Sequence, residues 1–190
     1  NLKVLEMQDN EIEYQGAASL APALGMMIQL QKLDLSRNEI EKSGASIAFV
    51  LENLIAFQTL QRFRDAEGTQ LNVDDDFNEI LDAVASVVEK HTLNLSSWGL
   101  HDADMSVLVP FLDKLDTLEE LNLCQNKLGE NSTPILQQLV SSMPHLTLRV
   151  SSNVQRYLVL PTQTRDRFLH RRYDIVWALV ATKLQRLGGG

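Results

Sequence analysis

The sequence predicts an α/β fold: a right-handed solenoid in which short parallel strands alternate with helices. The first observation is a repeated pattern, Leu-x-x-Leu-x-Leu-x-x-Asn-x-Ile or a close variant, which starts at Leu2, Leu30 and Leu118. The second is the spacing of 28 residues between Leu2 and Leu30, which is enough for one strand and one helix per unit. The third is that a single unit could not bury its apolar faces, so stacked units must share one core.

Each unit begins with residues suited to a short strand. The leucines alternate at a period of two, as at Leu33 and Leu35, so they point into the core while the side chains between them face outward. The asparagine that follows, such as Asn38 or Asn126, can satisfy backbone groups where the chain turns. The strands should therefore present one polar face to solvent.

The rest of each unit has the periodicity of a helix. Apolar residues recur at three- and four-residue spacing over residues 77–88 and again over residues 135–140. Residues 74–76, all aspartates, precede the first of these helices, where negative charge suits the helix N-terminus and predicts capping. Pro22 and Pro110 stand at the same place in their units, which predicts a late helix start in both.

The third unit is irregular. It starts at Leu60, but Asp65 replaces a core leucine and Gly68 replaces the asparagine. In the fourth unit Trp98 takes the asparagine position. That tryptophan is either an exposed contact anchor or a filler of space left by the irregular unit, and the sequence favours the filler. We expect an insertion or bulge over residues 60–75.

The chain divides into two predicted segments. Residues 1–153 form about five to six repeats, which are N-terminally incomplete because the chain begins within a unit, and residues 154–190 form a helical C-terminal cap. Residues 1–148 hold nine Lys/Arg against 23 Asp/Glu, a net charge of −14. Residues 149–190 hold eight Lys/Arg against two Asp, a net charge of +6. This asymmetry predicts segments with different roles.

Composition and motifs disfavour several classes of function. The single Cys124 excludes an internal disulfide and predicts a reducing, cytoplasmic location. No apolar run reaches the roughly 20 residues that a membrane helix needs. The four histidines lack metal-ligand spacing, and there is no glycine-rich phosphate loop. We therefore expect no enzyme activity, no cofactor or metal and no small-molecule substrate.

The repeated pattern, followed by Gly16 or Gly44 and an alanine-rich helix, resembles the ribonuclease-inhibitor-like leucine-rich repeats over roughly residues 2–153. Asp104 departs from it, because glycine is expected there. The resemblance implies a curved solenoid whose parallel strands line a concave binding face. The family includes inhibitors, sensors, regulators of small GTPases or of actin, and structural subunits of cilia. A non-enzymatic protein-interaction module is thus implied, with the partner left open.

Five charged residues are the candidates for binding a protein partner on the concave face. Arg62 and Arg64 fall in the outward columns of the predicted third strand, and Arg37 lies beside them, with Asp34 and Glu6 in the preceding units. Arginine is enriched among residues that dominate binding energy. The alternative is that these are ordinary solvated strand residues. An adaptor, sensor or scaffold would use this face.

A basic segment in the predicted cap is a second candidate surface, formed by Arg165, Arg167, Arg171 and Arg172. Positive charge near the start of a helix opposes the helix dipole, so an acidic group should compensate it. That group could belong to the acidic repeats of this chain, to an acidic protein tail or to RNA. If the compensating acidic group belongs to another molecule, the segment would dock the chain as a structural subunit of a large ciliary or ribonucleoprotein assembly. Few aromatic residues are interleaved, so the support for RNA is weak.

Overall fold

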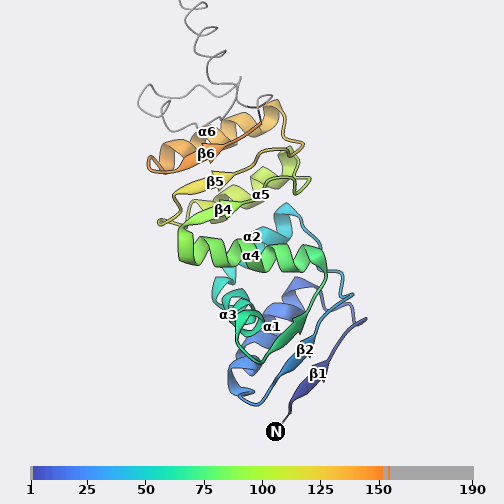
Figure 1. Cartoon of the computed structure of the whole chain (residues 1–190). Coiled ribbons are helices and arrows are strands. Elements are labelled where there is room, and N and C mark those ends of the chain that lie inside the picture. The colour runs from blue at the N-terminus through green and yellow to red at the C-terminus, as the bar shows by residue number, and fades with distance from the viewer. Residues whose placement is uncertain (1, 152–153, 155–190) are drawn as a thin grey trace, which may run out of the picture.

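The computed structural model describes residues 2–151 and 154, in which short strands alternate with helices (Figure 1). The strands are β1 (Val4–Glu6), β2 (Lys32–Asp34), β3 (Gln70–Asn72), β4 (Thr92–Asn94), β5 (Glu120–Asn122) and β6 (Thr147–Arg149). The helices are α1 (Glu13–Met26), α2 (Gly44–Glu52), α3 (Leu54–Asp65), α4 (Asp75–Lys90), α5 (Asp102–Leu112) and α6 (Thr133–Ser142), with a short 3₁₀ turn, η1 (Glu130–Ser132), before α6.

The six strands form two parallel sheets, ordered β1-β2-β3 and β4-β5-β6. Parallel neighbours need a crossover connection, and the helices provide it. The central residue of every strand is a leucine, and these leucines stand in register: Leu5, Leu33 and Leu71 in the first sheet, and Leu93, Leu121 and Leu148 in the second. The predicted α/β alternation of parallel strands and helices is confirmed.

Asparagines that follow the strands join neighbouring repeats, as predicted from their position. The side chain of Asn38 is fully buried. Its Nδ2 donates to the backbone oxygens of Met7 (2.9 Å) and Leu35 (2.9 Å), and its Oδ1 accepts from the backbone N–H groups of Asn10 (2.9 Å) and Ile12 (3.2 Å). Its Nδ2 also donates to the Ser36 backbone oxygen (3.2 Å), so one side chain satisfies five backbone groups in two repeats and fixes the turn after β2.

The third strand is not where the leucine pattern placed it. The segment starting at Leu60 belongs to α3, and the strand that pairs with β2 is Gln70–Asn72. Leu33 and Leu71 are therefore 38 residues apart, ten more than Leu5 and Leu33. The helical face explains the error, because Phe57 and Leu60 are fully buried three residues apart. The enlarged repeat holds a second helix, α3, between α2 and β3.

The row of strands breaks between β3 and β4, where α4 crosses the molecule between the two sheets (Figure 1). Its apolar side is buried, as the periodicity predicted. Behind α4, α2 packs directly against α5. Gly44, at the start of α2, allows this approach because a Cβ at that position would lie 2.5 Å from the Cβ of Asp104. Asp104 in turn accepts a hydrogen bond from the Gly44 backbone N–H (3.2 Å).

Trp98 fills the space at this junction. Its side chain is only 8% exposed, and the Nζ of Lys42 lies 5.9 Å from its ring centroid. Lys42 also forms ion pairs with Asp76 (3.1 Å) and Glu79 (2.8 Å) of α4. The space-filling role favoured for Trp98 is confirmed, and the tryptophan takes part in holding the enlarged repeat against the next one.

The prolines do not mark late helix starts. Pro22 and Pro110 lie inside α1 and α5, in the last turns of both helices. Within residues 2–151 and 154, no helix is long and apolar enough to cross a membrane. The predicted cap at residues 154–190 lies, apart from Val154, outside the described residues.

Candidate partner-binding surface

Each strand directs its middle leucine inward and its two flanking side chains outward. We call the outward side chains of β1–β6 the strand face; it corresponds to the concave face expected from the sequence. On the first sheet it consists of Val4, Glu6, Lys32, Asp34, Gln70 and Asn72. On the second sheet it consists of Thr92, Asn94, Glu120, Asn122, Thr147 and Arg149.

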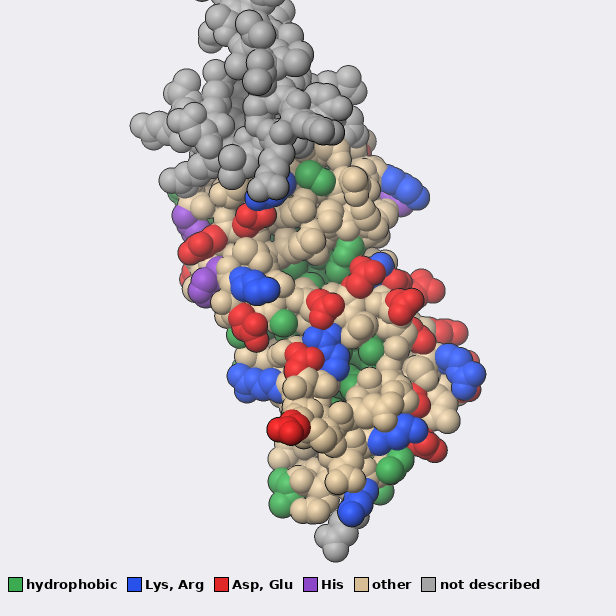
Figure 2. Space-filling model, viewed as in Figure 1, with side chains coloured by type: hydrophobic (Ala, Val, Ile, Leu, Met, Phe, Trp, Pro, Cys, Tyr) green, Lys and Arg blue, Asp and Glu red, His purple; other side chains and the backbone are tan. Residues whose placement is uncertain are grey.

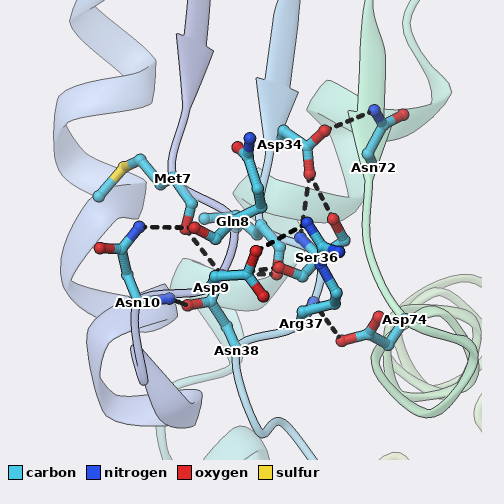
Figure 3. Close-up of polar contacts among 11 residues, drawn as sticks. Met7, Gln8, Asp9, Asn10, Asp34, Ser36, Arg37, Asn38, Asn72 and Asp74 are labelled. Atoms are coloured by element: carbon cyan, nitrogen blue, oxygen red, sulfur yellow. Dashed lines mark hydrogen bonds and ion pairs between the residues drawn. The ribbon is translucent and has the colours of Figure 1, made fainter.

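Asp34 lies at the centre of the polar network on the first sheet (Figure 3). Its Oδ1 accepts from the Ser36 backbone N–H (3.1 Å) and hydroxyl (2.6 Å), and its Oδ2 accepts from Asn72 Nδ2 (2.8 Å). The hydrogen bond from the Ser36 hydroxyl, followed by that from Asn72, lowers the pKa of Asp34 below its usual value. The carboxylate is therefore charged at neutral pH, and it ties β2 to β3.

The same contact recurs on the second sheet with an amide in place of the acid. Asn94 Oδ1 accepts from the Ser96 backbone N–H (3.2 Å), and Asn122 Oδ1 accepts from the Cys124 backbone N–H (3.0 Å). The side chain at this position thus shapes the turn after the strand. Asp34 has the same structural role and in addition supplies a charge that its two counterparts lack.

Glu6 and Arg37 are exposed charged candidates. Glu6 is 53% exposed and pairs with Lys32 across the two strands (2.9 Å). Arg37 is 66% exposed and its guanidinium pairs with Asp9 (2.7 Å). Exposed pairs of this kind contribute little to stability and can exchange partners at small cost. Both side chains are therefore free to engage an approaching surface.

Arg62 and Arg64 are not on the strand face, contrary to the prediction. Both lie in α3. Arg64 is 17% exposed and pairs with Asp65 (2.7 Å) and with Asp82 of α4 (2.8 Å), so it joins two helices. The strand positions assigned to these arginines are held instead by Gln70 and Asn72. The helical spacing of the buried residues upstream is the signal that could have revealed this.

The three aspartates at the start of α4 act differently from the predicted cap. Asp75 and Asp76 occupy the first turn, as expected, but the Asp74 side chain makes no capping bond to its own helix. Its Oδ2 instead accepts from the Arg37 backbone N–H (2.7 Å), and Asp76 Oδ2 accepts from the Lys42 backbone N–H (3.1 Å). These carboxylates therefore join the start of α4 to the segment after β2, and Figure 3 shows the contact of Asp74 with Arg37.

Acidic side chains gather on one edge of the first sheet. Figure 2 shows them along the right-hand side, where β1–β3 end and α4 begins. Residues 1–76 hold 13 Asp/Glu against six Lys/Arg. This excess charge should attract a basic surface and repel an acidic one.

The second sheet offers mainly uncharged polar groups beside one ion pair, Glu120 with Arg149 (3.0 Å). Cys124 lies in the turn after β5, and burial raises the pKa of its thiol. A raised pKa opposes formation of the thiolate that nucleophilic chemistry requires. Among residues 2–151 and 154, no three His, Cys, Asp or Glu side chains are grouped so that they could hold a metal ion. The basic segment Arg165–Arg172 lies outside the described residues.

Comparison with known proteins identifies the type of repeat. The model of the family described as Leucine Rich repeat matches residues 1–21 and 29–46, which cover β1, β2 and the first parts of α1 and α2. No curated protein matches the chain. The first two units are therefore similar to leucine-rich repeats, which generally form protein-interaction modules.

Proposed function

We propose that this chain is a non-enzymatic interaction module, an adaptor, sensor or scaffold, that binds a partner protein through the strand face of its first sheet. The observation that carries the proposal is the row of Glu6, Asp34 and Asn72, which stand in register across three strands, with exposed Arg37 at its end. Charged and amide groups spaced by one strand each suit recognition of another protein surface. Arg62 and Arg64 have no part in it.

The repeat architecture supports the proposal. We infer that the units stack as a right-handed solenoid of the ribonuclease-inhibitor-like class, extending over residues 1–153 and closed by a cap within residues 154–190. The parallel register of the strands and the buried asparagine at Asn38 support this inference. Asn126 repeats the contact, because its Nδ2 donates to the backbone oxygens of Leu95 (2.7 Å) and Leu123 (3.0 Å).

The charge of the face indicates the chemistry of the partner. Because acids predominate over residues 1–76, a basic protein surface is the best complement. Glu6 and Asp34 would pair with lysine or arginine side chains of the partner. Arg37 would pair with an acidic side chain and so fix how the two proteins align. Electrostatic attraction of this kind raises the association rate and weakens with added salt.

Charge reversal tests the proposal. The partner would first be purified with the full-length protein from its native cells, with and without nuclease, and identified by mass spectrometry. Its affinity for Glu6→Lys and Arg37→Glu should then fall by about tenfold or more at unchanged melting temperature. Asp116→Lys, an exposed reversal in the turn before β5, is the matched control. Affinities equal to that of the control would refute the proposal.

A second candidate function rests on the charge asymmetry of the chain. The net charge of +6 over residues 149–190 could dock the protein as a structural subunit of a large ciliary or ribonucleoprotein assembly. Replacement of Arg165, Arg167, Arg171 and Arg172 by Glu should then abolish co-purification while the strand-face variants retain it. Loss of the partners on nuclease treatment would identify RNA as the attachment.

A further inference from the structure

An open groove of about 670 Å³ lies between the C-terminal half of α1 and the turn from α2 into α3. Most of its surface is apolar. Small residues create it, because the short side chains on α1 leave room beside the first turn of α3. The apolar lining comes from Ala21, Pro22 and Gly25 on one side and from Leu54, Ile55 and Ala56 on the other.

Large apolar side chains are most exposed at this corner of the molecule. Ile55 lines the groove and is 82% exposed, while Met26 and Ile28, which follow Gly25 in the chain, are 78% and 86% exposed. Elsewhere in the described part of the chain the exposed large hydrophobics are Leu2, Val4 and Val107, at 46–47%. Single exposed apolar residues are ordinary, but several beside an apolar groove mark an interaction surface.

Glu52 gives the groove a charge. It is the one ionisable residue in the lining, and its side chain makes no hydrogen bond or ion pair with another described residue. Asn53 beside it uses its Nδ2 to donate to the Phe49 backbone oxygen (3.0 Å), which leaves the amide oxygen as an acceptor. An occupant that offers a cation at this end would be matched by a carboxylate and an amide oxygen.

We propose that this groove is a second docking surface, which takes an amphipathic helical segment of a partner protein with a lysine or arginine at one end. Its apolar side chains pack against Ile55 and the small residues of α1, and its cation pairs with Glu52. A groove between two helices suits a helix with apolar residues at three- and four-residue spacing. A second copy of this chain is a poorer match, because in a twofold contact the same surface meets itself, and the one ionisable residue of this lining, Glu52, is an acid and offers no cation.

The probe for this proposal is a phage-displayed library of helical peptides with randomised apolar and charged positions, selected on the full chain. The expected result is enrichment of peptides with an apolar stripe and a terminal Lys or Arg. Their affinity should fall about thirtyfold on Ile55→Glu, the change that corresponds to loss of one dominant contact. Glu52→Lys should also weaken them, and a peptide with its cation changed to Glu should restore binding to that variant.

Controls separate this surface from the strand face and from misfolding. Val107→Glu, an exposed aliphatic on α5, and Glu6→Lys should leave peptide affinity unchanged. Because Ile55 is 82% exposed, Ile55→Glu should keep the melting temperature of the parent. The proposal is overturned if no peptide is enriched or if the enriched peptides bind Ile55→Glu as tightly as the parent. It is also overturned if sedimentation shows a dimer that Ile55→Glu dissociates.

Discussion

The contact between α2 and α5 yields the sharpest stability prediction, which concerns Gly44→Ala. The added Cβ would lie 2.5 Å from the Asp104 Cβ, 2.7 Å from its Oδ1 and 2.9 Å from its Cα. The Oδ1 could move with the Asp104 side chain, but the Cβ is fixed to the Cα, which belongs to the backbone of α5. Relief of the clash therefore requires the two helices to separate where the enlarged repeat meets the next one.

The expected cost follows from two effects. Overpacking a close helix contact costs about 1–3 kcal/mol. Weakening the hydrogen bond from the Gly44 backbone N–H to the Asp104 carboxylate, 3.2 Å long, adds about 1 kcal/mol. The better helix propensity of alanine offsets up to about 1 kcal/mol. The net loss should be about 1–4 kcal/mol, which lowers the melting temperature of a chain of this size by roughly 2–16 °C.

Urea unfolding followed by circular dichroism measures this loss, and Gly25→Ala provides the matched control. Gly25 is also helical, but a Cβ there would meet nothing within 4 Å, so its substitution should be neutral or mildly stabilising. The reasoning is refuted if the two alanine variants have unfolding free energies within about 0.5 kcal/mol of each other, the usual scatter for surface changes.

Three further predictions concern the turns after the strands. Glu39 has a φ of 56° and the equivalent Gly99 has a φ of 72°, a backbone conformation that favours glycine. Glu39→Gly should therefore raise the unfolding free energy by about 0.5–1 kcal/mol, and Gly99→Ala should lower it. The urea midpoint measures both changes. Asn38→Ala leaves five backbone groups in two repeats without their side-chain partner and should cost about 3 kcal/mol or more in the same assay. The lowered pKa of Asp34 means that its stabilisation is complete above the unfolded-state pKa of about 3.9 and is lost as pH falls through the folded-state pKa. Asp34→Asn should therefore lose less stability than the parent between about pH 5 and pH 2, and carboxyl NMR should place the Asp34 midpoint below that of a model peptide.

The regular repeats could be predicted from the sequence because each strand carries its own local signature. Leucines alternating around Leu33, Leu93 and Leu121 permit one register only, since a shift by one residue would turn them all toward solvent. The asparagine that closes the turn, as at Asn38, gives the strand a fixed end. Local pattern and tertiary contacts agree in these units, so the sequence was sufficient.

The third repeat could not be predicted because its local pattern is ambiguous. Leu60 and Phe63 fit the start of a leucine-rich unit as well as the buried side of a helix. The true strand has only Leu71 between polar neighbours, which is a weak signal for so short an element. The break between the sheets depends on how α4 packs against other elements, which no local pattern encodes.

Only part of the candidate site could be predicted, because the regular repeats have a clear local pattern and the third repeat does not. Glu6 and Asp34 were placed on the strand face because their own repeats are regular, whereas Arg62 and Arg64 were misplaced with the third strand. The groove beside Ile55 was missed because an isoleucine in an apolar-rich segment is expected in the core. Its exposure follows from the bend between α2 and α3, which ends the buried face of α2 at Leu51.

Hydrogen exchange of the full-length protein with its co-purified partner tests the central claim most directly. Binding through the strand face predicts slower exchange in the turns at residues 7–11, 35–42 and 73–76, where backbone amides adjoin the candidate residues. The peptides that cover residues 154–190 should be unchanged. Protection confined to residues 154–190, or to the groove segments 21–28 and 52–59, would contradict the claim that the partner binds the strand face of the first sheet.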